Sequence, residues 1–411
     1  MIYRNENLNA LAQHLGMIED TRDERGKLHR LIDILILAVY GMLWGHTDFT
    51  NMAKELKYHE AYFVELLGLQ NGIPSHDTFS AAFGLINPQE FLECFISWMA
   101  GVMSTKGKHV AIDGKAVRAA CDKVHGGKVP YLVNTYVAEA GLCIGQIRID
   151  EKTNEIKGIP DMLEWLDLEG ATISIDAIGC QKEIVKMLVE KGADFVLQVK
   201  DNQSALHDDI MLEMQTRIQE KEIRDELEKK RREKGIRAER SANDPLDVHQ
   251  QCEHDHGRIE RRTCYVLNDS ACVNGEDWPE VKGVGLVFRE RLVIKRDVDG
   301  NVLDGAPSEE WSVYVMSRAM TAEEFACQIR MHWSIENSCH WVLDDYFRED
   351  RCTARIGHAI ENLGLLRKTV FNLMKLDENV KKESMRGKQI YYRNNPDAIW
   401  KLLFEDIPRK Q

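Results

Sequence analysis

The sequence lacks any long hydrophobic run. The longest apolar stretch covers residues 31–44 and is interrupted by Asp33. A helix needs about 20 apolar residues to cross a bilayer, so this stretch predicts a buried helix and excludes a membrane channel. The first residues also lack the pattern of a secretory signal peptide. We therefore expect a cytoplasmic protein with no membrane partner.

Cysteine pairs and positive net charge are missing as well. The chain has 10 cysteines, but none of them forms a Cys-x-x-Cys pair, which excludes a disulfide scaffold and favours reduced thiols. The 54 Lys and Arg residues are outnumbered by 67 Asp and Glu residues, for a net charge of −13. General attraction to nucleic acid is therefore not expected, although a local basic face is compatible with this balance.

The composition that remains is that of a soluble globular protein. The chain has 411 residues, of which 44% are hydrophobic and 29% charged, and this length predicts two or three domains. The first hundred residues contain three segments with apolar residues at helical spacing, namely 28–44, 49–67 and 78–99. Ser75 in GIPSHDTF is placed to cap the third of these helices.

Strand patterns begin near residue 109. HVAIDGKAV, YLVNTYVAEAG and LCIGQIRI predict three consecutive strands, followed by a helix over residues 158–166. ATISIDAIG, CQKEIVKMLVEKGA and DFVLQVK then predict a strand, a helix and a strand. Further strands are expected at RRTCYVL, GVGLVFRERLVI and WSVYVMS, and one long helical segment from Ala322 to about Phe371. This order predicts an α/β fold with a mixed sheet.

Residues 203–247 differ from the rest because charges of both signs crowd together, most densely in residues 219–240. Such a segment forms either a solvated helix with ion pairs four residues apart or an arm that binds nucleic acid. The mixture of signs favours the solvated helix.

Three carboxylates stand out against apolar surroundings. Asp113 and Asp176 each lie inside an apolar strand pattern, and Glu336 lies in a helix pattern beside Trp333 and Trp341. Burying an unpaired carboxylate is costly, so we expect the three acids to meet in a site at one edge of the sheet. Carboxylates suit Mg²⁺, and two such ions can hold both oxygens of a phosphoryl displacement. The alternative is that each acid is an ordinary capping or ion-paired residue.

Several long strings together resemble one known family. They are GIPSHDTF (72–79), AIDGKAVR (111–118), SIDAIGCQKEI (174–184), GADFVLQVKDNQ (192–203), HGRIERR (256–262) and HWSIENSCHWVLDDYFRED (332–350). The chain resembles, nearly end to end, the DDE transposases of bacterial insertion sequences, in the H-repeat-associated group. The resemblance implies a ribonuclease-H-like fold in which Asp113, Asp176 and Glu336 are catalytic and bind Mg²⁺, with Mn²⁺ as a substitute.

The resemblance also implies a domain organisation. Residues 1–103 would form a helical domain that recognises DNA ends, and residues 104–203 with 321–375 the ribonuclease-H-like catalytic core. Residues 204–320 would form an inserted helix-plus-β subdomain, and residues 376–411 a basic C-terminal tail. The expected partner is double-stranded DNA, both the inverted repeats and the target, bound by a homodimer or a larger synaptic complex.

The sequence departs from one motif of this family. Many relatives carry Tyr-x2-Arg-x3-Glu-x6-Lys around the glutamate, whereas this chain has Ile329, His332, Glu336 and Leu343 at those places. Only the glutamate matches. We expect His332 to replace the arginine as a donor to phosphate.

Further residues are predicted to contact DNA because they lie near the acids or within the matching strings: Lys115, Arg118, Lys200, Asn202, Gln203, His256, Arg258, His332, Trp333 and Asn337. For Lys115 and Arg118 the alternative is an ordinary surface charge. For Trp333 and Trp341 it is core packing rather than base stacking. The HQQCEHDHGR stretch (249–258) could bind zinc, but zinc is not favoured because no second ligand pair accompanies it.

The sequence thus predicts a transposase that binds the terminal inverted repeats of an insertion sequence, cleaves the ends and transfers them to target DNA by two-metal phosphoryl transfer. Two alternatives remain open. One is a ribonuclease-H-like nuclease that does not join ends. The other is a domesticated DNA-binding protein without transposition activity.

Overall fold

The computed structural model describes residues 10–121, 128–149, 155–234, 245–255, 258–293, 295–296, 302–303 and 307–405. The chain divides into two compact units, which are taken one at a time below. The first unit contains Met1–Asp167 and Ser334–Gln411, and the second contains Leu168–Trp333. No helix among the described residues is long and apolar enough to span a membrane.

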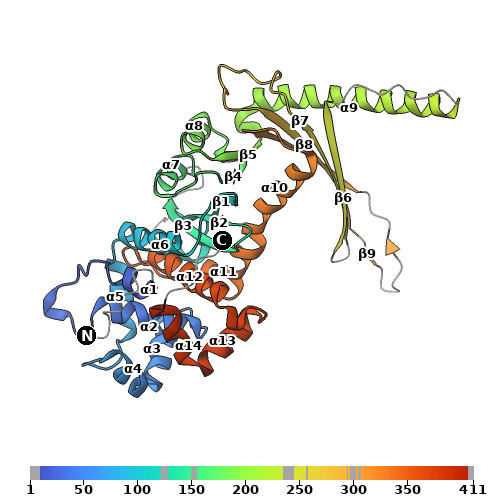
Figure 1. Ribbon diagram of the computed structural model, residues 1–411. Coiled ribbons are helices and arrows are strands. Elements are labelled where there is room, and N and C mark those ends of the chain that lie inside the picture. The colour runs from blue at the N-terminus through green and yellow to red at the C-terminus, as the bar shows by residue number, and fades with distance from the viewer. Residues whose placement is uncertain are drawn as a thin grey trace. The chain divides into compact units, whose positions relative to one another are not determined.

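Helices make up most of the first unit (Figure 1). In its N-terminal part they are α1 (Leu11–Leu15), α2 (Leu31–Leu43), α3 (Phe49–Tyr58), α4 (Glu60–Leu67), α5 (His76–Leu85) and α6 (Pro88–Val102), with a 3₁₀ turn η1 at Glu24–Gly26. The three helical segments expected from the sequence are therefore confirmed, two of them as pairs of helices. The predicted cap is confirmed too, since the Ser75 hydroxyl accepts a hydrogen bond from Thr78 N at 3.2 Å.

The most apolar of these helices, α2, is buried almost completely because it has no polar face. Its single acid, Asp33, is 3% exposed, and Arg30 compensates it with hydrogen bonds of 2.7 and 2.8 Å. The C-terminal part of the chain packs here as well, through α12 (Ala359–Leu376), η9 (Glu378–Val380), α13 (Met385–Asn394) and α14 (Pro396–Phe404). Since α12 contacts α2, α5 and α6, the two ends of the chain share one core.

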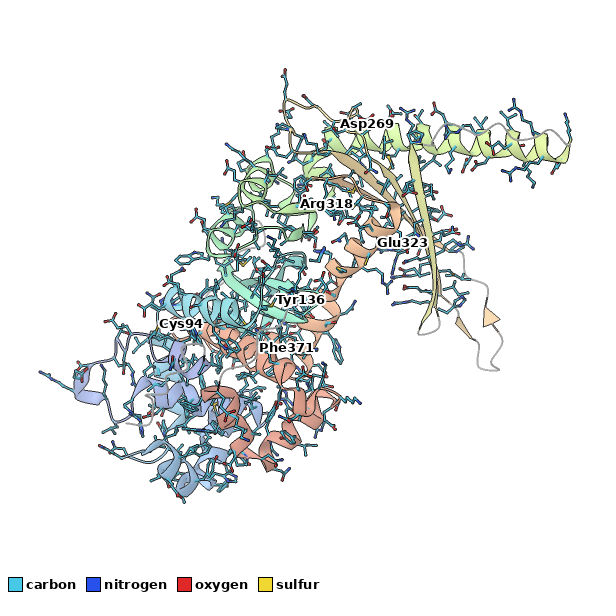
Figure 2. The ribbon with its side chains drawn as sticks, in the orientation of Figure 1. Cys94, Tyr136, Asp269, Arg318, Glu323 and Phe371 are labelled. Atoms are coloured by element: carbon cyan, nitrogen blue, oxygen red, sulfur yellow. The ribbon has the colours of Figure 1, made fainter. Side chains whose placement is uncertain are left out.

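The sheet of the first unit is an antiparallel meander, as the sequence predicted. Its strands are β1 (His109–Ala116), β2 (Tyr131–Val137) and β3 (Leu142–Ile149), with β2 in the centre, and η2 (Arg118–Ala120) follows β1. Helix α7 (Glu155–Trp165) packs on β2 and β3, and α12 packs on β3. Tyr136 of β2 and Phe371 of α12, both labelled in Figure 2, are fully buried in this unit.

The second unit begins with a parallel pair of strands joined by a helix. These elements are β4 (Thr172–Ile175), η5 (Ala177–Gly179), α8 (Lys182–Glu190), β5 (Asp194–Val199) and η6 (Asp201–Gln203). Antiparallel strands continue the sheet from β5 in the order β11 (Ser308–Met316), β8 (Gly283–Val293), β7 (Arg258–Leu267) and β6 (Leu246–Asp255). A short ribbon pairs β9 (Lys295–Arg296) with β10 (Val302–Leu303).

Two helices complete the second unit (Figure 1). Helix α9 (Ser204–Glu233) contacts β6, β8 and β11. Helix α10 (Ala322–Ser334) packs its Phe325 in a core cluster with residues of β5, β7, β8 and β11. Helix α9 carries ion pairs four residues apart, such as Lys230–Glu226 at 2.6 Å and Arg217–Glu213 at 2.8 Å. The prediction of a solvated, ion-paired helix is therefore confirmed for residues 204–233, while residues 235–244 of the predicted segment lie outside the described residues.

The predicted fold class is confirmed: the chain has a mixed α/β fold with a helical N-terminal part and an inserted region of helix and strands. The meander followed by strands that alternate with helices is the element order expected of a ribonuclease-H-like core. Strand β6 was not predicted, because its sequence LDVHQQCEHD is too polar to resemble a buried strand. The predicted domain limits remain a prediction.

One element was predicted wrongly. The helical segment from Ala322 to Phe371 is not continuous, since α10 passes into a π-helical turn η7 (Ile335–His340) and α11 (Trp341–Asp345), and a loop over residues 346–358 precedes α12. The loop contains only the short η8 (Glu349–Arg351). Gly357 in this loop has φ +47, which a helix cannot accommodate.

Candidate active site

Asp113 lies near the end of β1, opposite Asn134 in the central strand β2. Its side chain is 16% exposed, so one face of the carboxylate is accessible while the rest is enclosed. Oδ1 accepts a hydrogen bond of 2.9 Å from Gly114 N, and Oδ2 lies 3.5 Å from Nδ1 of His340. The carboxylate is therefore held from two sides.

His340 was not predicted from the sequence, although it contacts Asp113, one of the three predicted catalytic acids. The ring is buried, and its Nε2 lies 3.0 Å from Nδ2 of Asn134, which also donates to Leu132 O at 3.2 Å. Because an amide nitrogen can only donate, Nε2 is assigned as the acceptor and the proton is assigned to Nδ1, which faces Asp113. The one sequence feature that could have identified His340 is its position four residues after Glu336.

Glu336 lies in the π-helical turn η7, and its side chain is exposed. Two contacts set the helix beside β1: His340 approaches Asp113, and Asp344 forms an ion pair with Lys115. His340 and Asp344 therefore face β1, and Glu336 lies in the same π-helical turn as His340. Turns of π-helix inside α-helices occur frequently at functional sites.

Asp176 follows β4 and begins the turn η5. Its Oδ1 accepts a hydrogen bond of 2.6 Å from Ala177 N. Asn202 and Gln203, predicted as DNA contacts, hold this same turn: Asn202 Nδ2 donates to Ala177 O at 2.9 Å. Gln203 Nε2 donates to Cys180 O at 3.1 Å. Their side chains therefore fix the loop after Asp176.

His332 and Trp333 lie at the end of α10. His332 Nδ1 is 2.8 Å from the hydroxyl oxygen of Ser174, which is two residues before Asp176 on β4. Trp333 is 41% exposed, and the guanidinium of Arg289 stacks 5.5 Å from its ring centre. Trp341, in the first unit, is 56% exposed. The alternative that both tryptophans pack in a core is therefore wrong.

The two basic residues after Asp113 have different environments. Lys115 is 9% exposed, and its ammonium contacts Asp344 and, at 3.0 Å, Glu349. Burial by itself lowers the pKa of Lys115, but Glu349 and Asp344 outweigh it and hold this pKa above its ordinary value. Arg118 is exposed and lies 3.7 Å from Asp350. These contacts favour a structural role for Lys115 and leave Arg118 accessible to a phosphate.

The remaining predicted DNA contacts are exposed where they are described. Lys200, Arg258 and Asn337 have exposed side chains. His256 lies outside the described residues. In its neighbourhood Cys252 Sγ lies 4.0 Å from His254 Nε2.

The basic excess after residue 351 is partly internal. Arg367, Lys368 and Lys388 are buried. Lys368 forms an ion pair with the buried Glu349 at 3.1 Å, and Lys388 donates to Met374 O at 2.5 Å. The charge that this region can offer to DNA is therefore smaller than its composition indicates.

The donor chemistry of the three acids suits a divalent cation with oxygen ligands. Asp113 and Glu336 belong to the first unit and Asp176 to the second. Within the described part of the chain, no three His, Cys, Asp or Glu side chains are grouped as a metal site. The convergence of all three acids therefore stays a prediction.

Comparison with known families decides the class of protein. Residues 12–99 match the family described as DDE_Tnp_1-associated, and residues 104–373 match the transposase DDE domain. The chain belongs to the DDE transposase family. The match to the DDE domain contains Asp113, Asp176 and Glu336, and the predicted family is confirmed.

Curated members of the DDE transposase family match over nearly the whole chain. The "H repeat-associated putative transposase YhhI" and the protein YbfL, both of Escherichia coli K12, are each 32% identical over 93% of this chain and 94% of their own length. Among solved structures, a piggyBac transposase synaptic complex with hairpin DNA is a distant neighbour. It is 9% identical with a TM-score of 0.41, and the match covers 96% of this chain and 77% of that one.

Proposed function

We propose that this DDE transposase is an active enzyme that binds the terminal inverted repeats of an insertion sequence, cleaves the element ends and joins them to target DNA. The observation that carries the proposal is the arrangement around Asp113. This acid and Glu336 belong to elements held together by the His340–Asp113 and Lys115–Asp344 contacts. The matched DDE domain supports the same assignment.

Asp113, Asp176 and Glu336 would hold the divalent cations, which are Mg²⁺ or, as a substitute, Mn²⁺. When bound, such ions activate the attacking oxygen and stabilise the leaving oxygen of a phosphoryl transfer. The protein's own contribution is to fix the acids. His340 and Asn134 orient Asp113, and Ala177 N with the side chains of Asn202 and Gln203 fixes the turn of Asp176.

The two reactions balance without a further reactant. In cleavage, a water oxygen forms a bond to phosphorus while the bond to the 3′-oxygen breaks, and that oxygen leaves as a 3′-hydroxyl after taking up a proton. In joining, this 3′-hydroxyl attacks a phosphodiester of the target, so one phosphorus–oxygen bond forms and another breaks. Both reactions need an anionic phosphorane-like transition state to be stabilised, and His332 is the residue we assign to the scissile phosphate.

Double-stranded DNA is the proposed partner, bound in the cytoplasm by a homodimer or a larger synaptic complex. The helices of residues 1–103 would recognise the inverted repeats. Arg118, Lys200, Arg258 and Asn337 have exposed side chains that can reach a backbone. Trp333 offers an exposed ring on which a base can stack.

A joining assay tests the proposal. Duplexes that carry the inverted repeats flanking the gene are supplied either intact or already cut, together with a supercoiled target and Mg²⁺. A transposase converts both substrates to joined product. A nuclease that does not join would process only the intact duplex, and a domesticated DNA-binding protein would shift both duplexes without altering either.

A further inference from the structure

A cavity of about 500 Å³ in the first unit is lined by arginines and by none of the three predicted catalytic acids. Its walls come from the beginnings of α3 and α5 on one side and from the loop over residues 346–358 on the other. Four arginines line it, namely the exposed Arg348, Arg351 and Arg355 and the buried Arg367, together with His76. The cavity is therefore locally basic in a chain of net charge −13.

Two of these arginines are not neutralised. Within the described ranges, the side chains of Arg348 and Arg351 form no hydrogen bond or ion pair, and both are exposed. Arg355, which also lines the cavity, donates to Cys121 O at 3.2 Å. Like charges placed together repel one another, so the guanidinium groups of Arg348 and Arg351 favour an anion in the cavity.

The acids of the cavity wall are already engaged. Asp48 caps α3, since its carboxylate accepts from Asn51 N and from Asn51 Nδ2, both at 2.8 Å. Asp77 lies 3.3 Å from Nε2 of His76. The two carboxylates of the cavity wall therefore have partners other than the arginines.

The backbone at Arg348 is strained. Its φ of 50 makes it the one non-glycine residue with positive φ among the described residues. Its neighbours hold it there: Phe347 O accepts from Arg367 Nε at 3.2 Å, and Glu349 is buried against Lys368. This conformation directs Phe347 and Glu349 inward and Arg348 outward. Strain maintained in this way is typical of a functional position.

The loop over residues 346–358, called the arginine loop below, is also fixed to α5. His358 N donates to Gly84 O at 3.0 Å, and Asn362 Nδ2 donates to Phe83 O at 2.8 Å. A Cβ at Gly357 would lie 2.2 Å from Gly84 O, so only glycine permits this close approach. The loop is therefore held in place before any ligand binds.

We propose that this cavity binds the phosphate backbone of duplex DNA at a site separate from the catalytic acids, an inference that rests on the proposed function. Arginine forks match phosphate oxygens in pairs. The wall formed by α3 and α5 belongs to the matched associated region, and the arginine loop belongs to the matched DDE domain. A backbone bound here therefore contacts both parts of the chain at once.

The test compares the Arg348→Gln/Arg351→Gln double variant with wild type. Arg231→Gln serves as the control, because Arg231 is an exposed arginine of the second unit that does not line the cavity. Fluorescence anisotropy measures binding of a labelled inverted-repeat duplex over a series of KCl concentrations. We expect the double variant to bind at least about tenfold more weakly and to lose about 1.8 from its salt slope, since each phosphate contact contributes about 0.9. The control should match wild type.

The Arg348→Gly variant separates a DNA-binding role of the Arg348 side chain from a purely structural role. Glycine adopts positive φ without strain, so this variant should melt at the same temperature as wild type or higher while binding DNA more weakly. A variant that binds DNA as wild type does would overturn the proposal.

Inorganic phosphate distinguishes the source of the anion. If millimolar phosphate raises the melting temperature of wild type but not of the double variant, while their DNA affinities stay equal, the cavity binds free phosphate and the DNA assignment is wrong. A failure of the proposed function is distinguishable, because it is seen in wild type itself, which would then give no joined product in the joining assay. The cavity proposal alone fails when wild type is active and the double variant keeps wild-type affinity and salt slope.

Discussion

Nδ1 of the buried His340 lies 3.5 Å from Oδ2 of Asp113, and Nε2 of the same ring lies 3.0 Å from Asn134 Nδ2. The imidazole thus connects the central strand β2 to the acid on β1. Groups that orient a metal ligand from behind are nearly as important as the ligand itself. In this chain the ring and Glu336 come from the same helical turn.

His340→Ala should raise the Mg²⁺ concentration needed for half-maximal cleavage by about 10–100-fold, because Asp113 loses the group that orients it. His340→Asn should restore part of the loss, since its amide nitrogen can donate in place of Nδ1. Cleavage measured against Mg²⁺ concentration tests this, with DNA affinity as the control. An unchanged Mg²⁺ requirement in His340→Ala would contradict the positioning role.

Glu349→Gln should lower the free energy of unfolding by about 3–5 kcal/mol, because Lys115 and Lys368 would lose a buried carboxylate that contacts both of them. Chemical denaturation measures the difference. Glu226→Gln is the matched control, since Glu226 pairs with Lys230 on the exposed surface of α9 and the substitution should leave stability nearly unchanged. Equal effects of the two substitutions would show that the buried cluster is not stabilising.

The buried cluster of Glu349, Lys115 and Lys368 also predicts that stability depends on pH. Burial opposes ionisation of Glu349, but Lys368 and Lys115 outweigh it and hold the pKa of this carboxyl well below its usual range. The stabilisation that ionised Glu349 provides is therefore fully present above the ordinary glutamate pKa. It is lost as the pH falls from there toward the pKa of Glu349 in the folded protein. The stability difference between wild type and Glu349→Gln should narrow by about 1.4 kcal/mol per pH unit in that interval. A stability difference between wild type and Glu349→Gln that stays constant from pH 6 to pH 3 would contradict the lowered pKa of Glu349.

Lys115 and Arg118 should respond in opposite ways to substitution. Arg118→Gln should reduce the salt slope of DNA binding by about 0.9 and change stability by less than about 0.5 kcal/mol, because the side chain is exposed. Lys115→Met should lower stability and leave the salt slope unchanged, because the ammonium is buried against Glu349. Salt titrations and denaturation curves on both variants check this. The reverse pattern would make Lys115 a phosphate contact after all.

The sequence predicted the meander, the parallel strands and the N-terminal helices because each has a clear hydrophobic period. Asp113 and Asp176 were identifiable for the same reason, since a lone acid inside an apolar strand is conspicuous. Strand β6 was not, because its residues between Leu246 and Asp255 are mostly polar and its pairing with β7 supplies the regularity.

The missed residues depend on contacts between distant parts of the chain. His340 follows Cys339 in a helix and has no motif of its own, and only the packing of that helix on β1 reveals its role. Asn202 and Gln203 were predicted as DNA contacts, which stays a prediction, but their hydrogen bonds to the turn after Asp176 could not be predicted from the sequence. The helix ends at α11, close to Arg348 with its positive φ. This conformation could not be predicted from the sequence, because arginine rarely adopts it.

Asp176→Asn in the cleavage and joining assay tests the central claim most directly. The substitution keeps the size of the side chain and removes its charge, so it should abolish both reactions in Mg²⁺. Binding of the inverted-repeat duplex should stay near the wild-type affinity, because recognition is assigned to the helices of residues 1–103. The loss of activity should exceed the roughly 10–100-fold effect expected for a residue that only supports a ligand. Cleavage by Asp176→Asn at the wild-type rate would contradict the assigned active site.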